Sequence, residues 1–218
     1  MKLFDFIKEV LRGKTLFRVI LFVGLKELFN QENWLNQSFK ILELGSEPAS
    51  HQRAFPSAWQ LTTTNVKTGD KVDFLLDAEQ KFSLTEASYD GVAIFNVLYL
   101  LNNYRQCLNE ALRVADKFVI FNIPLVAALA PQPHDFNRFT PDRIKEILED
   151  LKQTWPLMNY QIVPLGGSFT SAVNGLDVYL KFRIIRLPVY LLARALDGLD
   201  KMIKRQCPLQ YLVLIRKT

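Results

Sequence analysis

Apolar and charged residues alternate with helical spacing at the start of the chain. In residues 3–12 the apolar side chains fall on one face of a helix and the charged ones on the other. Gly13 interrupts this pattern, and a second apolar stripe follows over residues 16–28. The pattern predicts N-terminal amphipathic helices within residues 1–38, ahead of a separate domain over residues 39–218.

From residue 39 onward the rhythm changes to short apolar segments that alternate with helical ones. The strand-like segments are 39–44, 59–66, 72–76, 89–97, 117–124, 160–167 and 211–217. The helical segments are 102–115, 140–151, which has Thr140 as N-cap and Pro141 at its first position, and 168–206, which we expect to break around Pro188. Strands that alternate with helices predict a parallel α/β sheet, with ligands beyond the carboxyl ends of its strands.

The 218-residue chain has a net charge of +5, and this charge is unevenly distributed. Lys and Arg outnumber Asp and Glu by six to four in residues 1–38 and by nine to three in 167–218, whereas the middle has twelve against fifteen. The basic ends are also the most apolar parts, which favours an anionic membrane surface over nucleic acid as a partner. Two other interpretations stay open: solvated charges on packed helices, and a homodimer interface.

Cysteine and histidine are scarce. Cys107 and Cys207 form neither a metal-binding spacing nor a disulfide framework, and two histidines, His51 and His134, cannot build a histidine metal site. The apolar stretch 15–25 is too short to span a bilayer and lacks a cleavage site. We therefore expect no metal and no transmembrane helix, and a cytoplasmic protein that associates peripherally with the inner face of the membrane.

Polar residues recur where the predicted strands end. In "ILELGSEPAS" (41–50), Glu43 and Gly45 close the first strand. The glycine allows the backbone to approach a ligand, and the acid can hold an ammonium or a hydroxyl group. Asn65 ends the second strand, Asp77 follows the third, where it can accept from an adenine amino group, and Asn96 ends the fourth. This succession is typical of a nucleotide-type cofactor site.

Over roughly residues 39–166 the succession resembles the class I S-adenosylmethionine-dependent methyltransferases. The segment "PHDFNRFTPDRIKEIL" (133–148) is similar to a stretch of bacterial methyltransferases associated with surface-glycan biosynthesis. The resemblance implies a Rossmann-like α/β fold: a seven-stranded methyltransferase sheet with helices on both faces, whose last strand, 211–217, is antiparallel and inserted before the sixth. The N-terminal helices and a helical insertion over 168–206 would be additions to that fold.

The resemblance also implies a site for S-adenosylmethionine. Its cofactor-binding residues would be Glu43, Gly45, Ser46, Asn65, Asp77, Ala78 and Asn96. His134 with Asp135 is the candidate base for a hydroxyl acceptor, and Arg138 could bind a substrate carboxylate or phosphate. The alternative is that these three residues brace their loop against the sheet.

The sequence departs from the family pattern at its first motif. Glu47 and Ala49 occupy positions where the family has glycines, with Pro48 between them, and Glu47 adds bulk and negative charge where the methionine part of the cofactor should lie. Asn65 stands where a ribose-binding acid is usual, and Leu100 where many relatives have histidine.

Two hypotheses follow: a methyltransferase acting on a surface-glycan or lipid-linked acceptor, and an inactive methyltransferase-like scaffold that binds a membrane surface or a protein partner. A nicotinamide-dependent oxidoreductase is disfavoured because G-x-G-x-x-G is absent after the first strand.

Overall fold

The computed structural model describes residues 3–45, 51–69, 72–127, 135–177, 179–180, 182–203 and 207–217. Its elements are, in chain order, α1 (Leu3–Leu11), α2 (Leu16–Gln31), β1 (Lys40–Leu44), η1 (Gln52–Ala54), β2 (Gln60–Asn65), β3 (Phe74–Leu75), β4 (Tyr89–Ile94), η2 (Leu98–Leu100), α3 (Tyr104–Val114), β5 (Ala115–Pro124), α4 (Pro141–Thr154), β6 (Met158–Leu165), α5 (Ser168–Leu176), α6 (Arg183–Leu196), α7 (Leu199–Ile203) and β7 (Gln210–Lys217).

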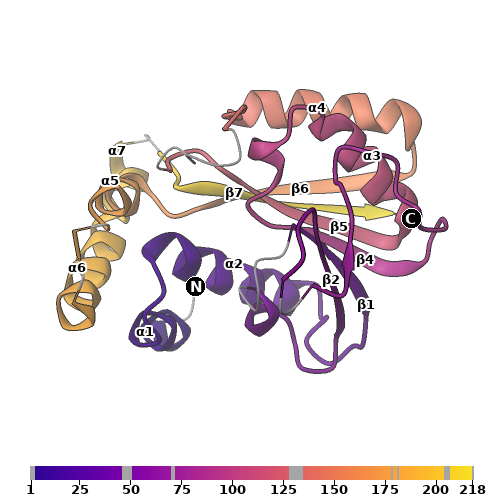
Figure 1. Ribbon diagram of the computed structural model, residues 1–218. Helices are drawn as coiled ribbons and strands as arrows, with labels where there is room; N and C mark the ends of the chain where they lie inside the picture. Colours follow the sequence, from indigo (N-terminus) through magenta and orange to yellow (C-terminus); the bar gives the residue numbers. More distant parts are fainter. Residues whose placement is uncertain are drawn as a thin grey trace.

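The strands form one seven-stranded sheet in the order β3-β2-β1-β4-β5-β7-β6 (Figure 1). Strands β1 to β5 pair in parallel, whereas β7 is antiparallel to both of its neighbours, β5 and β6. The predicted fold class is therefore confirmed, including the last strand inserted before the sixth. In such a sheet the strand order reverses between β1 and β4, where a crevice opens at the carboxyl ends.

Each central strand is buried on both faces, which explains why these segments read as continuous apolar runs. Along β5, Val119 and Phe121 belong to the core that α3 and α4 cover, while Phe118 and Ile120 belong to the core on the opposite face. Figure 1 shows α3 and α4 on one side of the sheet and α2 on the other. The sheet thus separates two hydrophobic cores.

Helix α2 is buried on nearly all sides rather than along one stripe. Its buried residues are Leu16, Val19, Ile20, Leu21, Phe22, Val23, Gly24, Leu25, Leu28 and Phe29. At Gly24 a Cβ atom would lie 2.7 Å from Leu165 Cδ2, so the helix approaches β6 closely. The Phe29 ring lies 4.8 Å from that of Trp59, within an aromatic cluster between helix and sheet. A helix that is apolar all round belongs in a core, and α2 forms part of the one below the sheet.

The helical segment before β7 does not break at Pro188, where the sequence predicted a break. Pro188 lies inside α6, and the non-helical residues that the structure describes between α5 and α6 are 177, 179–180 and 182. The prediction of a break around Pro188 is therefore wrong, because a proline within a helix can be accommodated by a bend and one missing hydrogen bond. The α5 N-terminus is capped by acids from beyond α6: Asp197 Oδ1 accepts from Phe169 N at 2.9 Å and Asp200 Oδ2 from Ser168 N at 2.7 Å.

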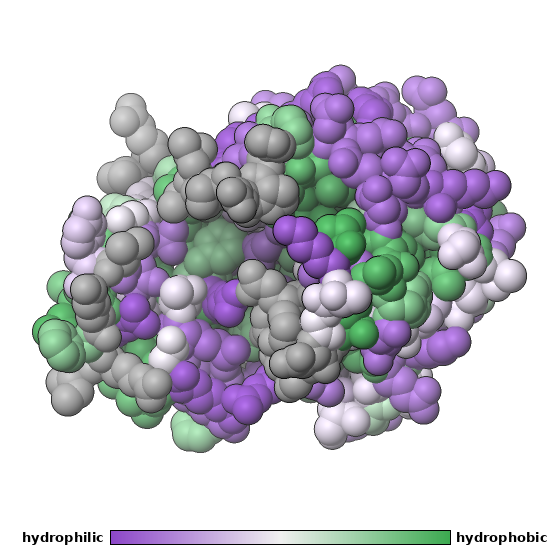
Figure 2. Space-filling model, viewed as in Figure 1, coloured by the Kyte–Doolittle hydropathy of each residue, from purple (hydrophilic) through white to green (hydrophobic). Residues whose placement is uncertain are grey.

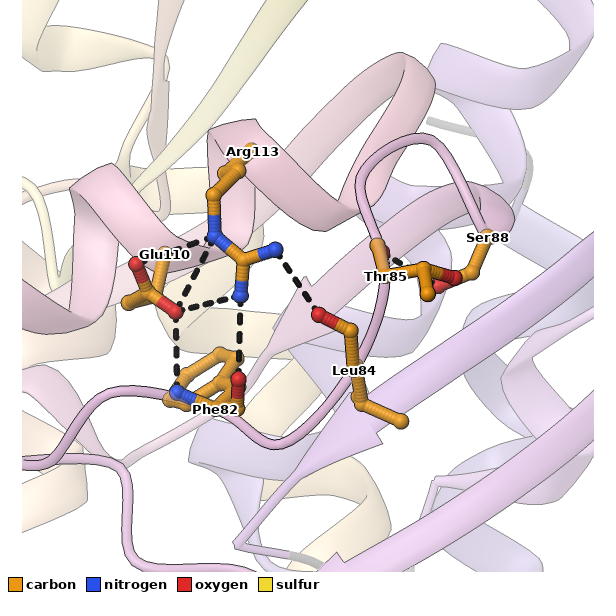
Figure 3. Close-up of polar contacts among 6 residues, drawn as sticks. All are labelled: Phe82, Leu84, Thr85, Ser88, Glu110 and Arg113. Carbon is orange, nitrogen blue, oxygen red and sulfur yellow. Dashed lines mark hydrogen bonds and ion pairs between the residues drawn. The ribbon is translucent and has the colours of Figure 1, made fainter.

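A charged pair on α3 holds the turn that leads into β4 (Figure 3). Arg113 donates to the carbonyl oxygens of Leu84 at 2.8 Å and Phe82 at 3.1 Å. Glu110 accepts from Phe82 N at 2.8 Å and forms an ion pair with Arg113 at 2.6 Å. The pair therefore satisfies backbone groups of a segment that has no strand partner there, and fixes how the chain enters the central strand.

Most other predicted elements appear within a few residues of their expected limits. Thr140 is the N-cap of α4, accepting from Arg143 N at 3.3 Å, and Pro141 is its first residue, as predicted. β3 is reduced to two residues, Phe74 and Leu75. None of the helices in the described part of the chain combines the length and the apolar character needed to cross a bilayer.

Candidate functional site

A cavity of about 1420 Å³ lies at the carboxyl ends of β1, β2 and β4. Drug-sized ligands usually occupy pockets of about 300–1,000 Å³, so this cavity has room for a nucleotide-sized ligand and a second molecule. Figure 2 shows the surface hollowed between the part built on the sheet and the part built on the C-terminal helices. The described residues that line it are Thr15, Phe17, Arg18, Gly45, His51, Asn65, Val66, Lys67, Leu76, Asp77, Ala78, Glu79, Phe95, Asn96, Val97, Tyr99, Leu100, Leu101, Pro124, Val126, Ala127, Asn174, Gly175, Asp177 and Arg186.

Gly45, at the end of β1, has a backbone conformation that requires glycine. Its φ is +68°, and a Cβ atom there would lie 2.4 Å from Val97 Cγ2. Real side-chain atoms do not approach so closely, so the position is restricted both by the backbone and by the neighbouring strand end. The chain therefore leaves β1 with bare backbone at the cavity wall, which is the arrangement that close approach of a ligand needs.

Glu43 and His51 form a buried pair beneath this turn. Their exposed fractions are 2% and 4%, and His51 Nδ1 lies 2.7 Å from Glu43 Oε1. His51 immediately precedes η1 and lines the cavity. From the sequence alone no partner for His51 could be identified. The one feature that pointed to this pair was that His51 follows Glu43, an acid at a strand end, by eight residues. The carboxylate of Glu43 is thus directed at His51 within the protein.

Asn65, Asp77 and Ala78 line the same side of the cavity, from the ends of β2 and β3. Asn65 Oδ1 accepts from Val66 N at 2.7 Å, and Asp77 Oδ1 accepts from Glu79 N at 2.9 Å. These short-range bonds fix the directions of the two side chains, one at the last residue of β2 and the other in the turn after β3. The topology thus brings these three predicted site residues together.

Asn96 connects the cavity to a buried chain of amide groups. It follows β4 with a φ of +59°, and its N–H donates to Asn122 Oδ1 at 2.8 Å. Asn122 Nδ2 donates to Asn96 Oδ1 at 2.9 Å and to Gln210 Oε1 at 2.7 Å. Gln210 Nε2 in turn donates to the Phe17 carbonyl oxygen at 3.0 Å. Sequence reasoning missed Asn122 and Gln210, which are fully buried and link β4, β5, β7 and α2 at the level of the site.

The predicted catalytic residues Asp135 and Arg138 form an ion pair with each other. The Arg138 guanidinium also lies 5.1 Å from the centre of the Tyr99 ring. The neighbouring Asn137 donates from Nδ2 to the Leu101 carbonyl oxygen at 2.7 Å. Within the described lining of the cavity, Tyr99 and Leu101 are present and the Asp135–Arg138 pair is not. The pair therefore fastens its segment to the turn that forms the wall.

Several residues of the first motif and the loop after β5 lie outside the described residues. They are Ser46, Glu47, Pro48, Ala49 and His134. The cavity is consequently defined here by Gly45 and His51 on either side of the first of these gaps.

The far side of the cavity is built by the N-terminal helix α2 and the helices before β7. Arg186 of α6 donates through Nη1 to the Gly13 carbonyl oxygen at 3.5 Å and pairs with Asp177 at 3.6 Å. These contacts tie α6 to the α1–α2 turn and to the end of α5. This part of the wall stands apart from the β1–β3 edge and carries both charged and apolar groups.

The described residues offer little for metal or thiol chemistry. None of their histidine, cysteine and carboxylate side chains gather into a group able to hold a metal ion. Cys107 is fully buried, and this burial raises the pKa of its thiol, so that it is not a nucleophile at neutral pH.

Comparisons with solved structures identify the fold. No family model matches the chain, and no curated protein matches it by sequence. An S-adenosylmethionine-dependent methyltransferase from Archaeoglobus fulgidus is similar with a TM-score of 0.57 and 14% identity, covering 89% of this chain and 93% of that one. The YcgJ protein from Bacillus subtilis is similar with a TM-score of 0.54 and 12% identity, covering 89% and 98%. The [4+2]-cyclase SpnF is similar with a TM-score of 0.50 and 13% identity, covering 89% and 80%.

These similarities and the strand order define the fold as that of class I methyltransferases. Because one of the similar structures is described as a cyclase, the fold by itself does not fix the reaction.

Proposed function

We propose that this protein is an S-adenosylmethionine-dependent methyltransferase. The observation that supports this most is the cavity at the β1–β4 switch point, where Gly45 leaves no side chain between backbone and ligand space. The adenosine moiety would lie along Asn65, Asp77 and Ala78, whose positions at the ends of β2 and β3 suit a ribose and an adenine. The cavity volume exceeds that needed for the cofactor, which leaves space for an acceptor.

When bound, S-adenosylmethionine supplies a sulfonium-activated methyl group for in-line transfer. The contribution of the chain is to hold the acceptor in line and to exclude water, which supplies much of the acceleration in such reactions. We assign Glu43 to positioning, because its carboxylate already accepts from His51 under the β1 turn. Asn96 would be held by Asn122, which fixes the strand end beside the reacting centre.

We further propose His134 as the base for a hydroxyl acceptor. Asp135 and Arg138 would then act indirectly, because Arg138 pairs with Asp135 and lies over the Tyr99 ring, which holds residues 135–138 beside the cavity wall. The acceptor that we propose is a surface glycan or its lipid-linked precursor, which is supported by the resemblance of residues 133–148 and by the second part of the cavity between α2, α5 and α6. Methyl transfer from isotope-labelled cofactor to a polyprenyl-linked glycan, compared with the same glycan free, would test this choice.

Calorimetric titration with S-adenosylhomocysteine tests the cofactor assignment. We expect saturable binding that Asp77→Ala weakens about tenfold, the loss that one hydrogen bond to a ligand produces. Asp116→Ala, an exposed carboxylate at the amino end of β5, is the matched control and should bind like the unaltered protein. Absence of binding at millimolar ligand would overturn the assignment and leave a methyltransferase-like scaffold that binds a membrane or a protein partner.

A further inference from the structure

Helix α6 is apolar on the side that faces away from the protein. Its inner side is buried at Tyr190 and Ala193, whose exposed fractions are 0% and 3%. Among the α6 residues whose side chains are described, the exposed ones are Ile185, Pro188, Leu192 and Ala195, which follow one another at intervals of three, four and three positions. A helix of a water-exposed surface normally carries polar residues on that side, and one that is apolar all round is normally covered.

The stripe is part of a larger surface, which we call the α1–α6 surface. Of the fifteen large apolar side chains that are exposed in the described part of the chain, ten belong to it: Leu3, Phe4, Leu11, Leu176, Tyr179, Phe182, Ile185, Leu192, Leu199 and Met202. Helix α1 packs against α6, with Arg194 lying 5.1 Å from the centre of the Phe6 ring. Figure 2 shows apolar side chains over α6 at this end of the molecule. Such a concentration marks an interaction site rather than scattered exposure.

Acidic side chains of the same elements are turned inward or paired. Asp177 and Asp200 have exposed fractions of 6% and 3%, and Asp197 caps the α5 backbone. In α1, Glu9 is 1% exposed, and Asp5 forms an ion pair with Lys26 at 2.9 Å.

Basic residues of these elements, in contrast, accompany the apolar ones. Lys8 of α1 is exposed near Leu11, and so is Arg12 just after α1, whose guanidinium also pairs with Glu9 at 2.5 Å. In the sequence, residues 167–206 carry seven Lys/Arg against three Asp/Glu. Two of these seven, Arg186 and Arg194, are half-buried against neighbouring helices. Apolar side chains mixed with cations, and carboxylates withdrawn, complement an anionic lipid surface, because long basic side chains reach the headgroups while apolar ones enter the interface.

The α1–α6 surface also adjoins the cavity. Asn174 and Gly175, near the end of α5, line the cavity, as do Arg186 of α6 and Phe17 at the start of α2. The same helices therefore present apolar groups outward and form the far wall of the site inward.

We propose that the α1–α6 surface docks on an anionic membrane, with α6 lying in the plane of the lipid interface. Docking would place the far part of the cavity next to the bilayer, where a lipid-linked acceptor enters. This role for the bilayer in acceptor entry rests on the proposed methyltransferase function. Membrane docking itself depends only on the exposed side chains and charges of the surface.

Vesicle flotation tests the docking. The full chain should float with vesicles of phosphatidylcholine and phosphatidylglycerol at low salt, and less with phosphatidylcholine alone or at high salt. Leu192→Glu should lower the vesicle-bound to free ratio at least about tenfold, since it removes one inserted leucine and adds a repelled charge. Leu157→Glu is the matched control, because Leu157 is 70% exposed in the α4–β6 turn, and it should float like the unaltered protein.

Three results would overturn the proposal. The unaltered protein could stay in solution with anionic vesicles at low salt, or Leu192→Glu could float as well as Leu157→Glu. Sedimentation equilibrium could instead show a dimer that Leu192→Glu dissociates while flotation is absent, which would assign the surface to a second copy of the chain. Titration of the unaltered protein and the same variants with S-adenosylhomocysteine separates the two proposals. If the unaltered protein floats with the vesicles but does not bind S-adenosylhomocysteine, only the methyltransferase proposal is overturned.

Discussion

At the scale of single residues, Gly45 carries the most restrictive geometry of the site. The strand-end position of this glycine was readable from the sequence because an apolar run led into it. Its φ of +68° and the contact with Val97 were not readable, since Val97 lies after β4 and reaches Gly45 only through the β1–β4 pairing.

Replacing Gly45 by alanine should therefore destabilise the protein and distort the cavity. The backbone conformation alone costs about 1–3 kcal/mol for a residue with a side chain, and the new Cβ would also displace Val97. Gly175→Ala is the control, because a Cβ there meets nothing within 4 Å and lies in α5; it should stabilise by up to about 1 kcal/mol. Urea denaturation of both variants measures the difference, and equal stabilities would contradict the account of the β1 turn.

The buried polar residues show where prediction from sequence stops. Gly45, Asn65, Asp77, Ala78 and Asn96 could be placed because each lies at or just after the end of a strand, and parallel strands end at one edge. Asn122 and Gln210 could not, since both sit within apolar strands and become partners only when β7 inserts beside β5. The hydrogen bond between them depends on the pairing of β5 with β7, which are far apart in the chain. The local pattern of apolar and polar residues does not indicate that pairing.

At the scale of elements, the Glu110–Arg113 pair of α3 shows how a helix fixes a neighbouring turn. Hydrogen bonds from Arg113, followed by the backbone N–H of Phe82, hold the pKa of Glu110 below its ordinary value of 4.5 although the side chain is buried. A carboxyl with a lowered pKa in the folded state stabilises the protein above its unfolded pKa, and this contribution is lost as pH falls through the folded value.

Glu110→Gln should consequently destabilise at neutral pH by about 1–2 kcal/mol, the value of a charge-assisted hydrogen bond. The difference from the unaltered protein should shrink as pH falls below about 4.5, where the unaltered carboxyl also becomes neutral. Denaturation series at several pH values measure this. Glu146→Gln, an exposed partner of Arg143, serves as control; a difference for Glu110→Gln that persists unchanged at low pH would contradict the role of its charge.

Element limits followed from the sequence wherever local chemistry set them. Thr140 and Pro141 located the start of α4 because capping and proline act within one turn. The helix break predicted from Pro188 was misplaced, because the packing around a proline determines whether it ends a helix or only bends it.

At the scale of the whole molecule, α2 belongs to the core of the sheet, while α1 contributes an outer surface. Phe29 of α2 is fully buried and packs against Phe55 and Trp59 from the β1–β2 connection. Phe4 of α1 is 74% exposed. The sequence predicted both as similar amphipathic helices, because the opposite face of α2 is covered only by elements distant in sequence.

Phe29→Ala and Phe4→Ala form a matched pair that tests this difference. Phe29→Ala should cost about 3–5 kcal/mol, as for other large buried side chains, because the aromatic cluster cannot close the cavity left behind. Phe4→Ala should leave the free energy of unfolding nearly unchanged while it weakens vesicle binding. Thermal unfolding combined with flotation reads both effects; comparable destabilisation by the two variants would contradict this division of roles.

The most direct test of the whole account is a crystal structure with S-adenosylhomocysteine. We expect the adenosine beside Asp77 and Ala78, the ribose near Asn65, and the amino-acid part over Gly45 within the cavity. Density for the ligand elsewhere, or a cavity closed at Gly45 by the side chains of residues 46–50, would contradict the assignment of this edge of the sheet as a cofactor site.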